Sequence, residues 1–174
     1  FDSGKVDGQE IDSLAYCPPI TLEPQTRYYW MVKIWGESDC AESDSAWFET
    51  AKMDNNWQAQ WITPVFDDNT IHPILYKSFD LAATVASARA YICGLGLYHF
   101  ELNGTKVGNE YLTPYCNAYD QWLQYQTFDI TDQLEVGSNL ISVMLGNGWY
   151  KGRYGSGGGV AEFYGDRFAL LCEI

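Results

Sequence analysis

The stretch ARAYICGLGLYHFELNGT, residues 88–105, holds two short strand-like segments that are separated by glycines and followed by an Asn-Gly pair. The segments 88–93 and 97–102 predict two β-strands. Asn103 and Gly104 both tolerate a positive φ angle, so the pair predicts a tight hairpin turn after the second strand. Asn103-Gly104-Thr105 is formally a glycosylation sequon as well, but the hairpin explains these residues without a secretory host.

Similar strand signals, with turn residues between them, recur along the chain on both sides of this stretch. No segment has convincing helical periodicity over three turns, and Thr131–Leu134 would form at most one helical turn. We therefore expect an all-β fold, a β-sandwich of jelly-roll or galactose-binding-like type. Besides 88–93 and 97–102, the predicted strands are 59–63, 74–81, 125–130, 139–145 and 167–174.

The first third of the chain has a different character. YYWMVKIW, residues 28–35, alternates like a strand with one buried face, and AWFET, residues 46–50, predicts a second strand. We interpret residues 1–51 as the closing part of a smaller β-sandwich, 52–63 as a linker with a first strand, and 64–174 as the larger sandwich. Because 167–174 ends inside a predicted strand, we expect the larger sandwich to be truncated and the chain to be part of a longer polypeptide.

Charge and composition limit the partners. The formal net charge is −13, from 10 Lys and Arg against 23 Asp and Glu. Nucleic acid and an anionic membrane surface are therefore excluded as partners, since both require a basic face. No apolar run approaches the roughly 20 residues of a membrane span.

Cysteine usage bears on the compartment. The spacing contains no C-x-x-C pair, so it offers no zinc site. An odd count leaves at least one thiol unpaired, and free thiols favour a reducing compartment, hence the cytoplasm over secretion. One disulfide stays open as an alternative. The five cysteines are Cys17, Cys40, Cys93, Cys116 and Cys172.

LGNGWYKGRYGSGGG, residues 145–159, carries seven glycines and follows a predicted strand. A dinucleotide fingerprint would need glycine where Lys151 stands, and a Walker loop would need Ser or Thr after that lysine. Neither condition is met, and the glycines that follow do not sustain a helix N-terminus for a phosphate. Nucleotide binding is therefore excluded.

Catalytic constellations are weak in this sequence. His72 and His99 lie where packed or surface histidines are common, and no G-x-S-x-G elbow occurs. Paired carboxylates are the mechanism of glycosidases, but solvated charges at strand ends explain the acidic residues equally well. We therefore assign no catalytic residue. The acidic residues considered for such a pair are Glu101, Glu110, Asp120, Asp129 and Asp132.

The glycine-rich stretch instead suggests a sugar platform. Aromatic rings stack on the apolar face of a pyranose, while amide and guanidinium groups bind its hydroxyls. A tight contact between domains, with Trp149 as its anchor, is the alternative. The candidate sugar-binding residues are Asn147, Trp149, Tyr150, Arg153 and Tyr154.

Several motifs carry a resemblance to a known family. Ala90–Gly104, YQTFDIT at 125–131 and LGNGWYKGR at 145–153 closely resemble the N-terminal β-sandwich module of bacterial α-L-rhamnosidases. Leu22–Trp30, together with the segments 46–50 and 57–62, resembles the fibronectin-type-III-like module that precedes it. The resemblance covers most of the chain.

The resemblance implies a function. The family consists of multidomain inverting hydrolases that release terminal L-rhamnose, and their catalytic carboxylates lie in an (α/α)₆ barrel. It implies that this chain is a non-catalytic accessory β-domain fragment whose partner is the catalytic domain of the same parent chain. The alternatives are a module that binds L-rhamnose or related carbohydrate, and a self-contained glycosidase.

The resemblance also raises one cofactor. Related modules of the family bind rhamnose with a calcium ion, but their ligands do not match residues of this chain one by one. Calcium therefore stays open, and no other cofactor is expected.

Overall fold

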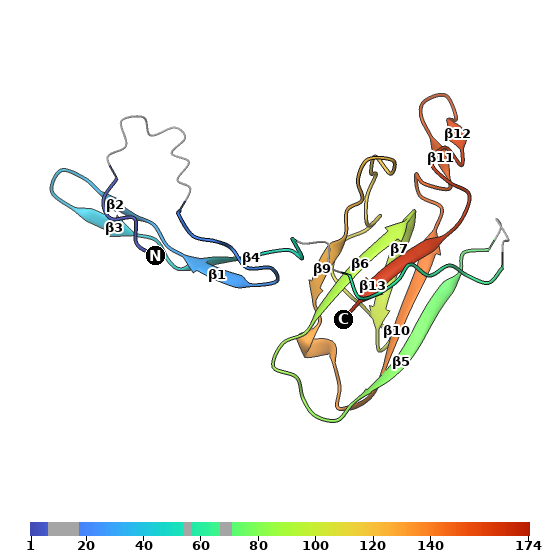
Figure 1. The fold of residues 1–174 in the computed structure, drawn as a ribbon, viewed down its shortest axis with the longest axis horizontal. Helices are drawn as coiled ribbons and strands as arrows, with labels where there is room; N and C mark the ends of the chain where they lie inside the picture. The colour runs from blue at the N-terminus through green and yellow to red at the C-terminus, as the bar shows by residue number, and fades with distance from the viewer. Residues whose placement is uncertain (7–17, 54–56, 67–70) are drawn as a thin grey trace. The chain divides into compact units, whose positions relative to one another are not determined.

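The computed structural model describes residues 1–6, 18–53, 57–66 and 71–174, so Cys17 and part of the expected linker lie outside the described residues. The chain divides into two compact units, Phe1–Asn56 and Trp57–Ile174. Within the described residues the only helical element is the 3₁₀ turn η2 (Thr131–Gln133), and all the other elements are strands (Figure 1). None of the helical structure in these residues is long and apolar enough to span a bilayer. The expected all-β fold is confirmed.

The first unit is a pair of nested antiparallel ladders. β1 (Arg27–Trp30) pairs with β4 (Ala46–Glu49), and β2 (Lys33–Trp35) pairs with β3 (Cys40–Glu42). Two residues separate β1 from β2, whereas three separate β3 from β4, so the hairpin contains a one-residue bulge.

The expectation of one strand over 28–35 with a buried face is therefore wrong. The bulge divides this stretch into β1 and β2, and side chains such as Trp30 and Ile34 are exposed. Alternation along the sequence reports a strand, but a bulge shifts the register by one residue and changes the face on which later side chains lie.

Two sheets of the second unit enclose its core. The larger has the order β5-β10-β7-β8, with all neighbours antiparallel and β10 bonded on both sides. Its turn at Asn103-Gly104 has φ angles of 52° and 75°, which confirms the expected Asn-Gly hairpin. The strands are β5 (Ile74–Leu81), β7 (Leu97–Leu102), β8 (Thr105–Lys106) and β10 (Gly137–Gly146).

The smaller sheet has the order β13-β6-β9, with β6 (Arg89–Leu95) in the centre, β9 (Gln126–Asp129) on one side and β13 (Ala169–Glu173) on the other. The strand expected at 59–63 is reduced to a single bridge between Ile62 and Leu170. The other strands expected in this unit are present, with ends that differ by at most two residues.

The core lies between these two sheets. Ile92 and Leu170 come from the smaller sheet, Phe100 and Val143 from the larger, and all four are almost completely buried. Alternate residues of β7, such as Tyr98, Phe100 and Leu102, enter this core, as the period of a strand requires. Burying such a side chain stabilises a fold by about 1.5–3 kcal/mol, so this layer holds the unit together.

Two asparagines connect the β7–β8 turn to the start of β10. The buried Asn139 accepts hydrogen bonds from Glu135 N (2.9 Å) and from Asn103 Nδ2 (3.0 Å), and it donates to Glu135 O (2.7 Å). Asn103 in turn accepts from Leu140 N at 2.8 Å. Removing either asparagine side chain would leave several polar groups without hydrogen-bond partners.

We predict that Asn139→Ala lowers the free energy of unfolding by about 2–4 kcal/mol, because buried backbone groups lose their partners. Urea unfolding measures the change. Ser138→Ala, at an exposed position next to it, is the control and should change stability by less than about 0.5 kcal/mol. Equal midpoints for the two variants would contradict the role of this network.

Glycines permit a close backbone contact where β10 leaves the sheet. Gly148 has a φ of 52°, and a Cβ atom there would lie 2.9 Å from Leu97 Cγ and 3.0 Å from the carbonyl carbon of Gly96. Gly96, at φ 107°, faces the carbonyl oxygens of Gly146 and Asn147. The turn between β6 and β7 therefore packs directly on the glycine-rich stretch, and side chains at 96 and 148 would separate them.

We predict that Gly148→Ala costs about 2 kcal/mol or more, since it combines an unfavourable φ with a steric clash. Gly157→Ala is the matched control, because Gly157 also has a positive φ (66°) but open space around its Cβ position. It should cost only about 1 kcal/mol. Thermal or urea unfolding compares the two, and a smaller loss at Gly148 would refute the steric argument.

Candidate functional site

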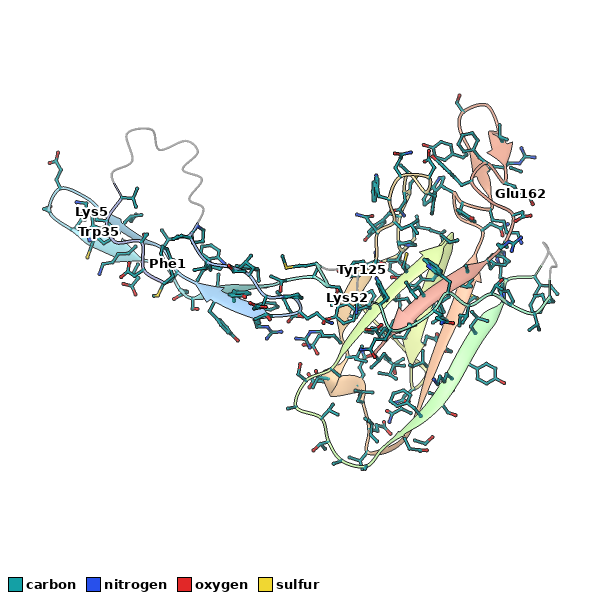
Figure 2. The ribbon with its side chains drawn as sticks, viewed as in Figure 1. Phe1, Lys5, Trp35, Lys52, Tyr125 and Glu162 are labelled. Atoms are coloured by element: carbon teal, nitrogen blue, oxygen red, sulfur yellow. The ribbon has the colours of Figure 1, made fainter. Side chains whose placement is uncertain are left out.

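The glycine-rich stretch forms a defined hairpin. β11 (Arg153–Tyr154) pairs with β12 (Val160–Ala161), and the turn before it is closed by hydrogen bonds from Lys151 N and Gly152 N to Asn147 O (3.1 and 3.3 Å). Glu162 N donates to the carbonyl oxygens of Lys151 and Gly152 (3.2 and 3.0 Å). Figure 2 shows Glu162 at the base of this hairpin.

The cationic side chains of Arg153 and Lys151 both make contacts within the second unit. Arg153 Nη1 donates to Gly158 O at 3.0 Å and Gly159 O at 3.1 Å, so this side chain fixes the glycine turn. Lys151 is buried, and its ammonium lies 4.1 Å from the ring centre of Phe168. These contacts give both cations a structural role.

Aromatic side chains gather beside the hairpin in what we call the hairpin aromatic cluster. It joins Tyr150 to Tyr119 (ring centres 5.2 Å apart), Tyr119 to Tyr164 (5.1 Å) and Tyr164 to both Phe163 (4.8 Å) and Tyr154 (5.5 Å). Tyr154 and Phe163 also stack on each other at 5.6 Å. Phe163 remains 56% exposed and therefore offers ring surface to a ligand.

The turn holds the other two candidates. Asn147 Oδ1 is buried and is without a hydrogen-bond partner among the described residues. Trp149 is half-buried two residues further on. A buried acceptor without a partner is uncommon in proteins and is a natural place for a ligand or water to donate a hydrogen bond.

The five candidates are thus only partly assembled. Tyr150 and Tyr154 enter one cluster, Arg153 holds the hairpin, and Asn147 and Trp149 lie in the preceding turn. The sequence argument missed Tyr119, Phe163 and Tyr164. The last two closely follow the glycine-rich stretch and could have been found by their position, whereas Tyr119 precedes it by some 30 residues and has no local signal.

The electrostatics suit hydrogen bonding better than acid–base chemistry. Burial raises the pKa of Tyr119 to about 12, so its phenol stays protonated at neutral pH. Two of the carboxylates considered as catalytic acids have partners already: Glu101 contacts His99 Nε2 at 3.1 Å and accepts from Ser142 Oγ at 3.3 Å, and Asp129 pairs with Arg89 at 2.9 Å.

Calcium requires six to eight oxygen ligands, commonly carboxylates. Among the described residues no group of three or more His, Cys, Asp or Glu is placed to hold a metal ion. Asn147 Oδ1 is a single suitable oxygen, which does not make a site. The described residues therefore do not provide the ligand set that calcium needs.

A pocket of about 310 Å³ lies near the same end of the sandwich. It is lined by residues of β7 and β10, including His99 and Met144, and by the segment that carries Glu110, Tyr111 and Leu112. Its walls are mainly apolar. None of the five candidate sugar-binding residues is among the residues that line it. The pocket and the hairpin aromatic cluster are separate features.

Comparison with known families identifies both units. Residues 83–174 match the family described as the alpha-L-rhamnosidase N-terminal domain, and residues 1–54 match the Rha78A-like N-terminal immunoglobulin domain. An alpha-L-rhamnosidase of Formosa agariphila is 35% identical over 86% of this chain. The match spans 18% of that relative, so the chain corresponds to less than a fifth of its length.

Solved structures agree with these matches. The alpha-L-rhamnosidase of Aspergillus terreus superposes with a TM-score of 0.76 at 30% identity, covering 87% of this chain and 18% of that one. The enzyme from Dictyoglumus thermophilum gives 0.72 at the same identity and coverage. The resemblance noted in the sequence is confirmed: the chain belongs to the family of α-L-rhamnosidase N-terminal domains, and its residues 1–54 match an immunoglobulin-like domain.

Proposed function

We propose that this chain is the accessory β region of an α-L-rhamnosidase, and that the polypeptide to which it belongs releases terminal L-rhamnose from glycosides. The observation that carries the proposal is the match of nearly the whole chain to a short part, 18%, of enzymes named alpha-L-rhamnosidase. In this proposal the β region supports a catalytic domain of the same polypeptide. We further propose the division into 1–51, 52–63 and 64–174.

The arrangement of acidic groups supports a non-catalytic role for this part. An inverting glycosidase needs an acid and a base carboxyl about 6.5–9.5 Å apart across the bound sugar. Here Glu101 is bound to His99 and Ser142, and Asp129 to Arg89. Both carboxylates thus take part in contacts that stabilise the sheets.

We predict that this chain alone does not hydrolyse an aryl α-L-rhamnoside, while the longer polypeptide does. Release of the chromogenic aglycone measures both, and an aryl β-D-glucoside serves as the control substrate. Turnover by the 174-residue chain would overturn the accessory role, and an inactive long polypeptide would overturn the rhamnosidase assignment.

Carbohydrate binding by the hairpin aromatic cluster is the second candidate function. Two observations favour it: Phe163 presents an exposed ring that stacks on Tyr154, and Asn147 Oδ1 is a buried acceptor without a partner among the described residues. A sugar would stack on the rings and place a hydroxyl on the amide. The ligand class is L-rhamnose or a related carbohydrate.

We predict that calorimetric titration of this chain with L-rhamnose, with and without calcium, gives binding heat. Phe163→Ala and Trp149→Ala should each lower the affinity at least about fivefold, close to 1 kcal/mol. Tyr29→Ala, an exposed aromatic of the first unit, should bind as the parent does. Absence of heat under both conditions would dismiss the binding function and leave the accessory role intact.

A further inference from the structure

We propose that one face of the larger sheet is the surface on which the rest of the rhamnosidase polypeptide docks, with the adjoining pocket receiving an apolar side chain from it. This inference rests on the proposed accessory role and adds where the contact is made. We call the surface the outer sheet face, and we define it by its central residues Ile74, Tyr76, His99, Glu101, Leu140, Ser142 and Met144. The polar residues Ser78, opposite Leu140, and Lys106, opposite Glu101, lie at its margin.

The pairing register puts these side chains on one face. Val143 and Leu145 of β10 enter the core, so Leu140, Ser142 and Met144 point to the opposite side. Residues directly opposite each other in neighbouring strands share a face. Met144 is opposite both Ile74 and His99, and Ser142 is opposite both Tyr76 and Glu101.

The two sheets differ in how their outer faces are covered. In the smaller sheet, three residues that point away from the core, Tyr91, Cys93 and Leu171, are less than 7% exposed. The rings of Trp57 and Tyr125 pack edge-on against Tyr91, at 6.5 and 6.3 Å between centres. Within the described residues of the second unit, the outer sheet face has no such cover: Ile74 is 59% exposed, Tyr76 77%, and Leu140 and Met144 each 44%.

The chemistry of the outer sheet face suits a lasting protein contact. Its apolar side chains surround a polar centre that is already hydrogen-bonded, because Glu101 binds both His99 and Ser142. A partner could therefore cover the face without leaving these polar groups unpaired. Exposed apolar side chains grouped on one side of a domain indicate an interaction site.

The pocket extends this surface at one end. His99 and Met144 belong both to the outer sheet face and to the pocket wall. Tyr111 and Leu112 also line the pocket and are largely exposed, and Leu112 has a φ of 59° that is unfavourable for leucine. Apolar walls around a defined hollow suit an aromatic or branched side chain of a docking partner.

The length of the relatives points to the occupant. The chain accounts for 18% of the rhamnosidases it matches, so more than four fifths of those polypeptides lie outside it. A partner on the same polypeptide is present at a high effective concentration, and a face of moderate size is then sufficient for stable docking. A separate protein or a second copy would have no such advantage.

Methionine oxidation tests the proposal directly. Met31, Met53 and Met144 are the three methionines, and all are exposed in this chain. Peroxide converts exposed methionine to its sulfoxide, which mass spectrometry quantifies for each peptide. We expect Met144 to oxidise at least about tenfold more slowly in the long polypeptide than in the 174-residue chain, because docking removes it from solvent. Equal rates would overturn the proposal.

A charge placed on the face gives a second test. Ile74→Glu should lower the melting temperature of the long polypeptide more than that of the 174-residue chain, since only the former would bury the charge. Val136→Glu, at an exposed position outside the face, should affect both chains alike. Equal shifts for Ile74→Glu in the two chains would contradict docking.

The outcomes separate this inference from the function on which it rests. An active long rhamnosidase in which Met144 oxidises as fast as in the short chain would refute the docking face alone. An inactive one would refute the proposed function. Protection of Met144 in the short chain by added L-rhamnose would assign the pocket to a saccharide and overturn its role as a docking pocket.

Discussion

The packing of the two sheets across the common core is the interaction on which the rest of the second unit depends. β6 and β10 are inner strands of these sheets and are hydrogen-bonded on both sides, so neither can leave without opening two ladders. Ile92 and Val143 meet other buried side chains between the sheets. Because each strand alternates its side chains, fixing the inner residues also fixes which residues reach the two outer faces.

The same layer positions the candidate sugar site. β10 ends at Gly146, and the close contact of Gly96 with Gly146 and Asn147 presses the following turn onto the β6–β7 turn. The hairpin that carries Tyr154 and Phe163 is thereby attached to the rigid part of the sandwich. Arg153 then closes the hairpin from within. The aromatic rings are held by backbone contacts that only glycine permits.

Two surfaces of the unit remain open for interactions, and they differ chemically. The hairpin aromatic cluster groups tyrosine and phenylalanine rings, which suit stacking on a carbohydrate. The outer sheet face presents aliphatic side chains and a tyrosine around a satisfied polar centre, which suit another protein surface. A domain that both binds sugar and packs on a neighbour would use these two surfaces independently, since the residues of one are not those of the other.

Much of the fold follows from local sequence: the strands β5 and β7 were predicted to the residue, as was the hairpin at Asn103, because strand alternation and turn chemistry act over a few residues. The family motifs likewise identified the rhamnosidase resemblance. Local sequence did not reveal the bulge between β1 and β2, the reduction of 59–63 to one bridge at Ile62, or the contact of Tyr119 with Tyr150. Each of these depends on which segments meet across the structure, and a period-two pattern specifies a strand without specifying its neighbour.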